Sequence, residues 1–160
     1  MSYKLVALPN PSVDISDIYS ARKIVDKALG GGYFSEHLDV ITCAWMCLHK
    51  GSIVGWAATS SEGDVGVLKC VVVDAEHRGK GIGQRFTDVR LKFLEGQGHE
   101  VVKSYAWIRV DGSCPSCKTL ERNGFTATEE LEGFYANYNH KCPSCKDECK
   151  CVARVYEKRL

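Results

Sequence analysis

The chain has 160 residues, of which 44% are hydrophobic and 26% charged, as in ordinary globular proteins. Its 21 lysines and arginines are balanced by 20 aspartates and glutamates, so no net charge favours a nucleic acid or an anionic membrane as a partner. The N-terminal residues do not resemble a signal peptide, and the longest apolar runs are too short to span a membrane. We therefore expect a cytoplasmic protein that binds neither nucleic acid nor membrane and forms a single domain over residues 1–160.

Strands and helices are predicted in alternation along the chain. Apolar residues recur at helical spacing between residues 16 and 29, and three consecutive glycines, Gly30 to Gly32, end that helix. The other expected elements are a strand within 2–8, a hairpin of 40–49 and 52–60, a strand over 65–73, a helix from 82 to about 96, a strand over 101–110, a short helix over 115–123, a strand and loop over 125–138, and a final strand over 152–158. This order predicts an α/β (α+β) fold, with a mixed central sheet and helices on both faces.

The most informative stretch is a glycine-rich turn between the strand over 65–73 and the following helix. The turn reads Arg78-Gly79-Lys80-Gly81-Ile82-Gly83. Amide groups at the start of a helix lack partners within the helix, and glycines let phosphate oxygens approach them closely. The spacing fits neither the dinucleotide-binding fingerprint nor the Walker pattern. By itself the turn could bind a nucleotide or a coenzyme A, or could be a tight turn without a ligand.

The sequence around this turn resembles the acetyl-CoA motif of the GNAT superfamily of N-acetyltransferases, usually written [Q/R]-x-x-G-x-[G/A]. Arg78 stands at the first position of the motif, and Gly81 and Gly83 fill its two small positions. Residues 53–56 are similar to the preceding strands of that family, and residues 120–125 to its late helix, which usually ends in Gly-Phe.

This resemblance implies a mostly antiparallel GNAT-like sheet and a reaction in a ternary complex. A neutral amine of unknown identity would attack the acetyl thioester, which would lie between the strand over 65–73 and the strand that contains residues 104–110. A backbone N–H group would stabilise the oxyanion. A homodimer would also be in keeping with the family. The acetyl-CoA-binding residues implied are Cys70, Val71, Val72, Val73, Arg78, Gly79, Lys80, Gly81, Ile82 and Gly83.

The expected proton donor is missing. Many GNAT enzymes use a tyrosine of the late helix to protonate the leaving thiolate, and Leu120 occupies that position here. Tyr135 is our candidate substitute, with Cys117, Tyr105, Tyr138 and solvent as alternatives. Glu36 and Asp111 are candidate acceptors of the amine proton, and His37 lies beside the first of them. Each of these residues could instead have only a packing, turn or surface role.

The chain contains nine cysteines, an odd number that argues against a disulfide framework where no export signal is present. Four of them, Cys142, Cys145, Cys149 and Cys151, crowd into a knuckle over residues 140–151 that begins with His140. Four thiolates can surround a structural Zn²⁺ tetrahedrally. A mixed site that includes Cys114 and Cys117 remains an alternative, as does a metal-free state. Cys43, Cys47 and Cys70 are expected in the core.

Together these features predict an acetyl-CoA-dependent N-acetyltransferase. Two other classes of function stay open: an acyl-CoA-binding sensor that has lost catalysis, and an interaction protein that recognises its partner through the zinc knuckle.

Overall fold

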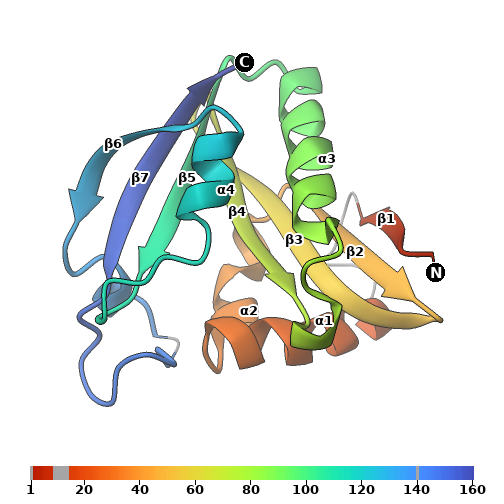
Figure 1. Ribbon diagram of the computed structural model, residues 1–160, viewed down its shortest axis with the longest axis horizontal. Helices are drawn as coiled ribbons and strands as arrows, with labels where there is room; N and C mark the ends of the chain where they lie inside the picture. Colours follow the sequence, from red (N-terminus) through yellow and green to blue (C-terminus); the bar gives the residue numbers. More distant parts are fainter. Residues whose placement is uncertain (1, 9–14, 140) are drawn as a thin grey trace.

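The computed structural model (Figure 1) describes residues 2–8, 15–139 and 141–160. Their strands form one sheet in the order β1-β2-β3-β4-β5-β7-β6. All neighbouring strands are antiparallel except β4 and β5, which are parallel. The mixed, mostly antiparallel sheet is therefore confirmed. The strands are β1 (Lys4–Leu8), β2 (Cys43–His49), β3 (Ser52–Glu62), β4 (Val65–Val73), β5 (Val101–Ile108), β6 (Thr126–Leu131) and β7 (Val152–Arg159).

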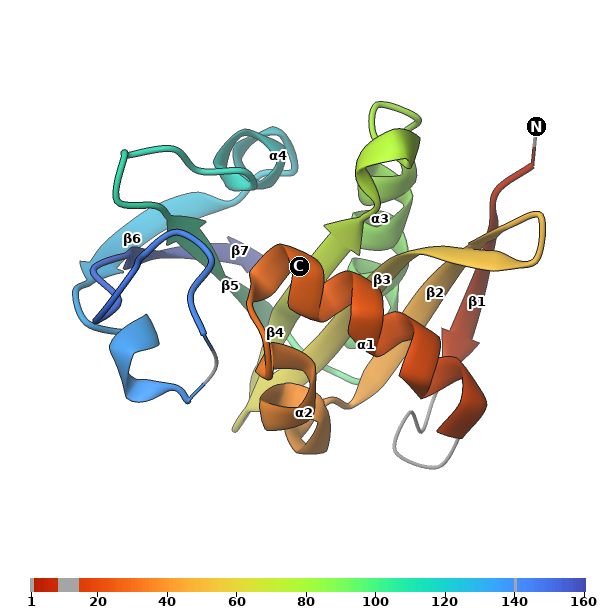
Figure 2. The same cartoon turned by 90° about the horizontal axis from the view of Figure 1, so that it is seen from below.

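Helices cover both faces of the sheet, as the sequence predicts. Figure 2 shows α1 and α2 on one face and α3 and α4 on the other. The helix α2 was not foreseen, because its five residues follow the glycine run directly and are too few to show a helical period. The helices are α1 (Ile15–Leu29), α2 (Tyr33–His37), α3 (Ile82–Gly96) and α4 (Cys117–Arg122), with short 3₁₀ turns at Leu38–Val40, Ala75–His77 and Tyr135–Asn137.

Each face of the sheet has its own apolar core. On the α1 face, Val25 and Phe34 pack with Trp56 of β3, which is fully buried. On the opposite face, Phe86 of α3 and Leu94 at its far end are buried against β3 and β4. The predicted core cysteines Cys43 and Cys47 are buried, whereas Cys70 is only partly buried. No helix among the described residues is both long and apolar enough to cross a membrane.

The only parallel pairing in the sheet is short. It joins Gly66–Leu68 of β4 to Val102–Ser104 of β5, after which the two strands separate (Figure 1). On its other side β4 stays paired with β3 up to Val73. The register of that pairing shifts at Lys69, since Ala58 faces Cys70 and Thr59 faces Leu68. Lys69 is thus the extra residue of a β-bulge, which bends β4 where it leaves β5.

The contact between β3 and α3 depends on a residue without a side chain. A Cβ atom added to Gly55 would lie 2.9 Å from Cε2 of Phe86 and 3.2 Å from the carbonyl oxygen of Val72. We expect Gly55→Ala to lower the free energy of unfolding by about 1–3 kcal/mol, the usual cost of overpacking a core, as measured by urea denaturation. Gly96→Ala is the matched control, because its Cβ would meet no atom within 4 Å. Equal stability of the two variants would contradict this packing.

Candidate functional site

A cavity of about 630 Å³ occupies the gap between β4 and β5. On the α3 side it is lined by the turn before α3 and by the first turns of α4. On the α1 side it is lined by the junction of α1 and α2 and by parts of the segment that connects β6 to β7. The cavity therefore runs through the sheet and opens toward both layers of helices. A long ligand and a second reactant could enter it from opposite faces.

The glycine-rich turn forms the α3 end of the cavity. Gly79 and Gly81 have positive φ angles of 72° and 78°, which side chains other than glycine rarely tolerate. The first helical hydrogen bond of α3 runs from Arg85 N to Gly81 O, so the amides of the residues between them have no acceptor in the helix. These amides form the N-terminal end of α3, where the helix dipole is positive. This end faces the cavity and favours the binding of a diphosphate. Nine of the ten residues expected to bind acetyl-CoA line the cavity, and Lys80 does not.

The exposed edge of β4 forms the middle of the cavity. Because β5 has moved away, backbone groups of β4 that face β5 beyond Leu68 have no strand partner there. An amide-containing chain laid in the gap could pair with them as a further strand would. Cys70 lies on this edge, and burial raises the pKa of its thiol to about 11. At neutral pH it is therefore protonated and a poor nucleophile.

A buried arginine of α3 supports the bend in β4. Arg90 is only 3% exposed, and its described hydrogen bonds all go to backbone carbonyls. Its guanidinium donates to Cys70 O at 3.0 Å, to Ala58 O at 3.5 Å and to Phe86 O at 3.2 Å. Ala58 and Cys70 face each other across β3 and β4 directly beside the bulge, so one side chain bonds both strands where β4 bends. Burial lowers the pKa of Arg90 to about 10, which leaves it charged at neutral pH.

The first turn of α4 closes the cavity beside β5. Leu120 is buried and lines the cavity, together with Thr119. A leucine therefore occupies the position where the family resemblance would place a tyrosine proton donor. Just before it, Cys114 and Cys117 form a disulfide with each other. This single local bond is not a disulfide framework, since the other seven cysteines are free, but it argues against the alternative of a mixed metal site that includes Cys114 and Cys117. The bond closes a loop whose two middle residues, Pro115 and Ser116, line the cavity.

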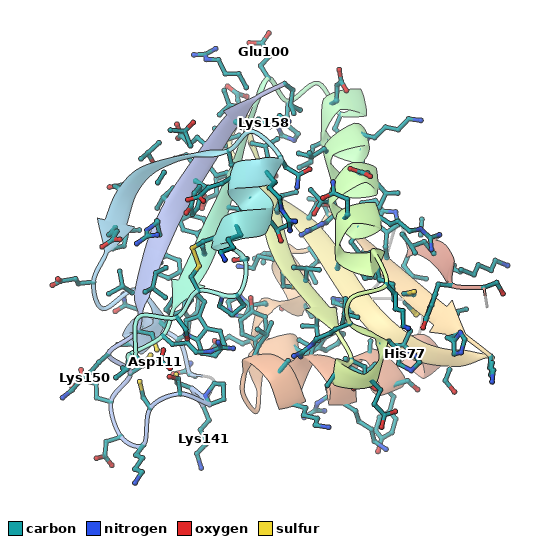
Figure 3. The ribbon with its side chains drawn as sticks, in the orientation of Figure 1. His77, Glu100, Asp111, Lys141, Lys150 and Lys158 are labelled. Atoms are coloured by element: carbon teal, nitrogen blue, oxygen red, sulfur yellow. A yellow bond between two sulfur atoms is a disulfide. The ribbon has the colours of Figure 1, made fainter. Side chains whose placement is uncertain are left out.

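The three candidate catalytic residues lie in different surroundings. Tyr135 lines the cavity, and burial is the main cause that raises its pKa well above the usual value. Glu36 lies behind the cavity wall, where its carboxylate accepts a hydrogen bond from the amide of Asn139 and lies 3.5 Å from His37. Asp111 is not part of the lining. Its carboxylate accepts hydrogen bonds from the amide and hydroxyl of Ser113, which lower its pKa, and Figure 3 shows it at the end of β5.

The C-terminal cysteines form a compact cluster. The sulfur atoms of Cys142, Cys145, Cys149 and Cys151 all lie within 4.8 Å of one another. Cys151 Sγ is 3.8 Å from Cys142 Sγ and 3.7 Å from Cys145 Sγ. These separations are far longer than a disulfide bond and match the edge of about 3.8 Å of a tetrahedron with metal–sulfur bonds of about 2.3 Å. His140, the first residue of the predicted knuckle, lies outside the described residues.

Several lining residues were not found from the sequence. Tyr33 belongs to the unforeseen helix α2, and Trp107 lies on the cavity side of β5, a strand whose register could not be known. Tyr105, an alternative proton donor in the sequence analysis, also lines the cavity. Arg90 left a readable signal, because it falls four residues after Phe86 and four before Leu94 on the apolar stripe of α3. A charged residue at such a position is unusual unless it has a specific role.

The sequence of residues 16–125 matches the family model described as the acetyltransferase (GNAT) family. The match spans more than half of the chain and includes α3 with the turn before it. The protein therefore belongs to the GNAT acetyltransferase family and is an acyl-transferring enzyme. Comparison of the sequence with curated proteins finds no significant match.

Solved structures with the same fold include a ribosomal-protein alanine N-acetyltransferase and complexes with acetyl-CoA. Ard1 from Thermoplasma volcanium superimposes with a TM-score of 0.74 at 18% identity, covering 100% of this chain and 99% of that one. The ribosomal-protein-S18-alanine N-acetyltransferase from Escherichia coli has a TM-score of 0.70 at 14% identity, with coverage of 99% and 94%. A GNAT acetyltransferase from Elizabethkingia anophelis with acetyl-CoA bound has a TM-score of 0.71 at 16% identity, with coverage of 99% and 98%. At these identities the likeness shows the fold.

The buried thiol of Cys70 provides a test of the cavity. With a pKa of about 11, roughly 0.1% of it is thiolate at pH 8, against about a quarter of an exposed thiol. We expect iodoacetamide to label Cys70 about a hundredfold more slowly than a free cysteine, with a rate that rises up to pH 11, and acetyl-CoA to slow it further. Site-resolved mass spectrometry measures these rates. Rapid labelling at pH 8, unaffected by acetyl-CoA, would show that Cys70 does not face the cavity as described.

Proposed function

We propose that this protein transfers the acetyl group of acetyl-CoA to a primary amine by direct attack in a ternary complex. The observation that carries the proposal is the cavity itself, which joins the glycine-rich turn, the unpaired edge of β4 and a second opening on the α1 face. The turn would bind the diphosphate and β4 would pair with the pantetheine amides. The thioester would then lie near Cys70, within reach of an amine that enters from the α1 face. Family membership supports acetyl transfer, and the acetyl-CoA complex of a similar structure supports the cosubstrate.

The surroundings of the cavity favour direct transfer over a covalent acetyl-enzyme. Among the described residues, the free thiols in the lining are Cys70 and Cys142. Burial keeps Cys70 protonated at neutral pH, so it is poorly suited to attack the thioester. The reaction then needs positioning, a donor for the oxyanion and a route for the amine proton. A backbone N–H group of β4 at the bulge would serve as the oxyanion donor.

For proton transfer, we propose Tyr135 as the donor to the CoA thiolate and Glu36 as the acceptor of the amine proton, through intervening groups. Tyr135 has the better position, because it lines the cavity and its raised pKa keeps it protonated. Glu36 influences Tyr33 and Lys69 electrostatically, and both of these residues line the cavity. Asp111 is a weaker candidate, because its carboxylate is exposed and bonded to Ser113.

We further propose that the four clustered cysteines hold a structural Zn²⁺ ion. Their sulfur atoms, all within 4.8 Å of one another, are close enough to share one ion, and four thiolates leave no open position for catalysis. The remaining parts of the proposal are a cytoplasmic location and an acceptor that is neither a nucleic acid nor a membrane. An acyl-CoA sensor without turnover stays the second candidate, supported by the leucine at position 120.

Amine-dependent release of CoA thiol from acetyl-CoA tests the enzyme proposal. The panel would contain small polyamines, amino acids, aminoglycosides and peptides with free N-termini, including one that begins with alanine, since an S18-alanine N-acetyltransferase shares the fold. We expect turnover with at least one class of amine and no acetylated protein in the mass spectrum. In Tyr135→Phe we expect kcat to fall about a hundredfold, the lower range for loss of a general acid.

Tyr19→Phe is the matched control, because Tyr19 is 65% exposed and lies outside the cavity lining. An unchanged kcat in Tyr135→Phe would show that Tyr135 is not the proton donor, and it would leave the proposed acetyl transfer intact. Acetyl-CoA binding without release of CoA by any amine would contradict the enzyme and favour the sensor.

A further inference from the structure

The four-cysteine cluster belongs to an unusually long connection between neighbouring strands. β6 ends at Leu131 and β7 begins at Val152, although two adjacent antiparallel strands need only a few residues to connect them. Among its described residues, the connection has one 3₁₀ turn, Tyr135–Asn137, as its only regular structure. Long irregular connections in compact folds are commonly functional. We call residues 132–151 the knuckle segment.

The knuckle segment lies on the same side of the sheet as α1 and α2 (Figure 2). Hydrogen bonds join it to the junction between them. The amide of Lys141 donates to Gly31 O at 3.0 Å, and the amide of Asn139 donates to the carboxylate of Glu36. The ring of Tyr138 also lies 4.7 Å from that of His37. The segment is therefore attached to the junction between α1 and α2, and not only to its own strands.

The same segment provides one wall of the cavity. Tyr135, Cys142 and Pro143 line it from the knuckle segment, while Leu29 and Tyr33 line it from α1 and α2. This end lies across the sheet from the glycine-rich turn, which is the end where the amine would enter. Cys142 belongs to both features, since it lines the cavity and is one of the four clustered thiols.

We infer that a Zn²⁺ ion bound by Cys142, Cys145, Cys149 and Cys151 builds the amine-binding half of the cavity. This inference rests on the proposed function of the cavity. Among the described residues of the knuckle segment, the turn Tyr135–Asn137 is the only regular backbone structure, so the free energy of metal binding would supply the order. The ion fixes Cys142 and Pro143 in the wall, and the bond from Lys141 to Gly31 extends that order to the α1–α2 junction.

The cosubstrate half of the cavity is independent of the metal. α3 and β4 are held together by Arg90 and by the apolar core on the α3 face, and no described hydrogen bond joins these groups to the four cysteines. Loss of the metal therefore affects the two halves differently. It loosens the amine-binding wall and leaves the acetyl-CoA site as it is.

Hydrogen exchange measured by mass spectrometry tests this inference on the full chain. Purified protein should contain one zinc per chain. After removal of zinc with a chelator, we expect amide exchange to accelerate about tenfold or more in residues 28–37 and 132–151, to stay unchanged in residues 78–94, and to return to its original rate when Zn²⁺ is added back. The Kd for acetyl-CoA, measured by titration, should stay within about twofold, whereas KM for the best amine of the panel should rise about tenfold or more.

The double variant Cys145→Ser, Cys149→Ser removes two ligands that do not line the cavity. It should reproduce the metal-free behaviour. Lys146→Ser, Glu148→Ser is its control, because both residues are exposed in the same segment and neither offers a thiol. Purified protein that contains no zinc would overturn the inference. So would an amide exchange rate in residues 28–37 that does not change when zinc is removed. Failure of the zinc-loaded protein to bind acetyl-CoA would instead contradict the proposed function.

Discussion

The separation of β4 from β5 is the feature on which the rest of the site depends. A parallel pair that continued along both strands would fill the middle of the sheet and leave no path through it. Here the pairing stops at Leu68, and the bulge at Lys69 turns β4 away while β3 stays attached. Arg90 donates hydrogen bonds to the carbonyls of Ala58 and Cys70, the paired residues next to the bulge. In the described part of the chain these carbonyls, and no carboxylate, compensate the buried charge of Arg90, so the charge is stabilised by the bent strands themselves.

The gap between β4 and β5 divides the proposed site into two halves, one on the α3 face of the sheet and one on the α1 face. The α3 half combines a glycine-rich turn with a helix start, and its chemistry suits a phosphate-bearing thioester. The α1 half is made of α1, α2 and the knuckle segment, which come from distant parts of the sequence and are joined by contacts such as Lys141 with Gly31. The core of each half lies on its own face of the sheet. The proposed amine-binding half can therefore vary while the proposed acetyl-CoA half is maintained.

Local sequence signals predicted the α3 half of the site, but they did not predict how the parts of the α1 half come together. Glycine spacing and apolar periodicity over residues 65–96 report on neighbouring residues, and so the strand, turn and helix there were predicted correctly, while the expectation of acetyl-CoA came from the resemblance of the turn to the family motif. The position of β7 between β5 and β6 depends on long-range pairing that no local pattern encodes. The α1–α2 junction and the path of the knuckle segment depend on tertiary contacts in the same way. The four cysteines were found because metal ligands cluster in sequence, whereas the disulfide of Cys114 with Cys117 could not be told from a metal pair by its spacing alone.

The central claim is that the glycine-rich turn and the open edge of β4 form an acetyl-CoA site, and calorimetric titration with acetyl-CoA tests it most directly. Gly83 offers a clean variant, because it lacks a positive φ angle and a Cβ atom there would meet no protein atom within 4 Å. Gly83→Trp should therefore fold normally and fill the place of the diphosphate. We predict saturable one-to-one binding by the wild-type protein, weakened at least about a hundredfold in Gly83→Trp and unchanged in Gly96→Ala. A folded wild-type protein that does not bind acetyl-CoA, or equal binding by Gly83→Trp, would contradict the account.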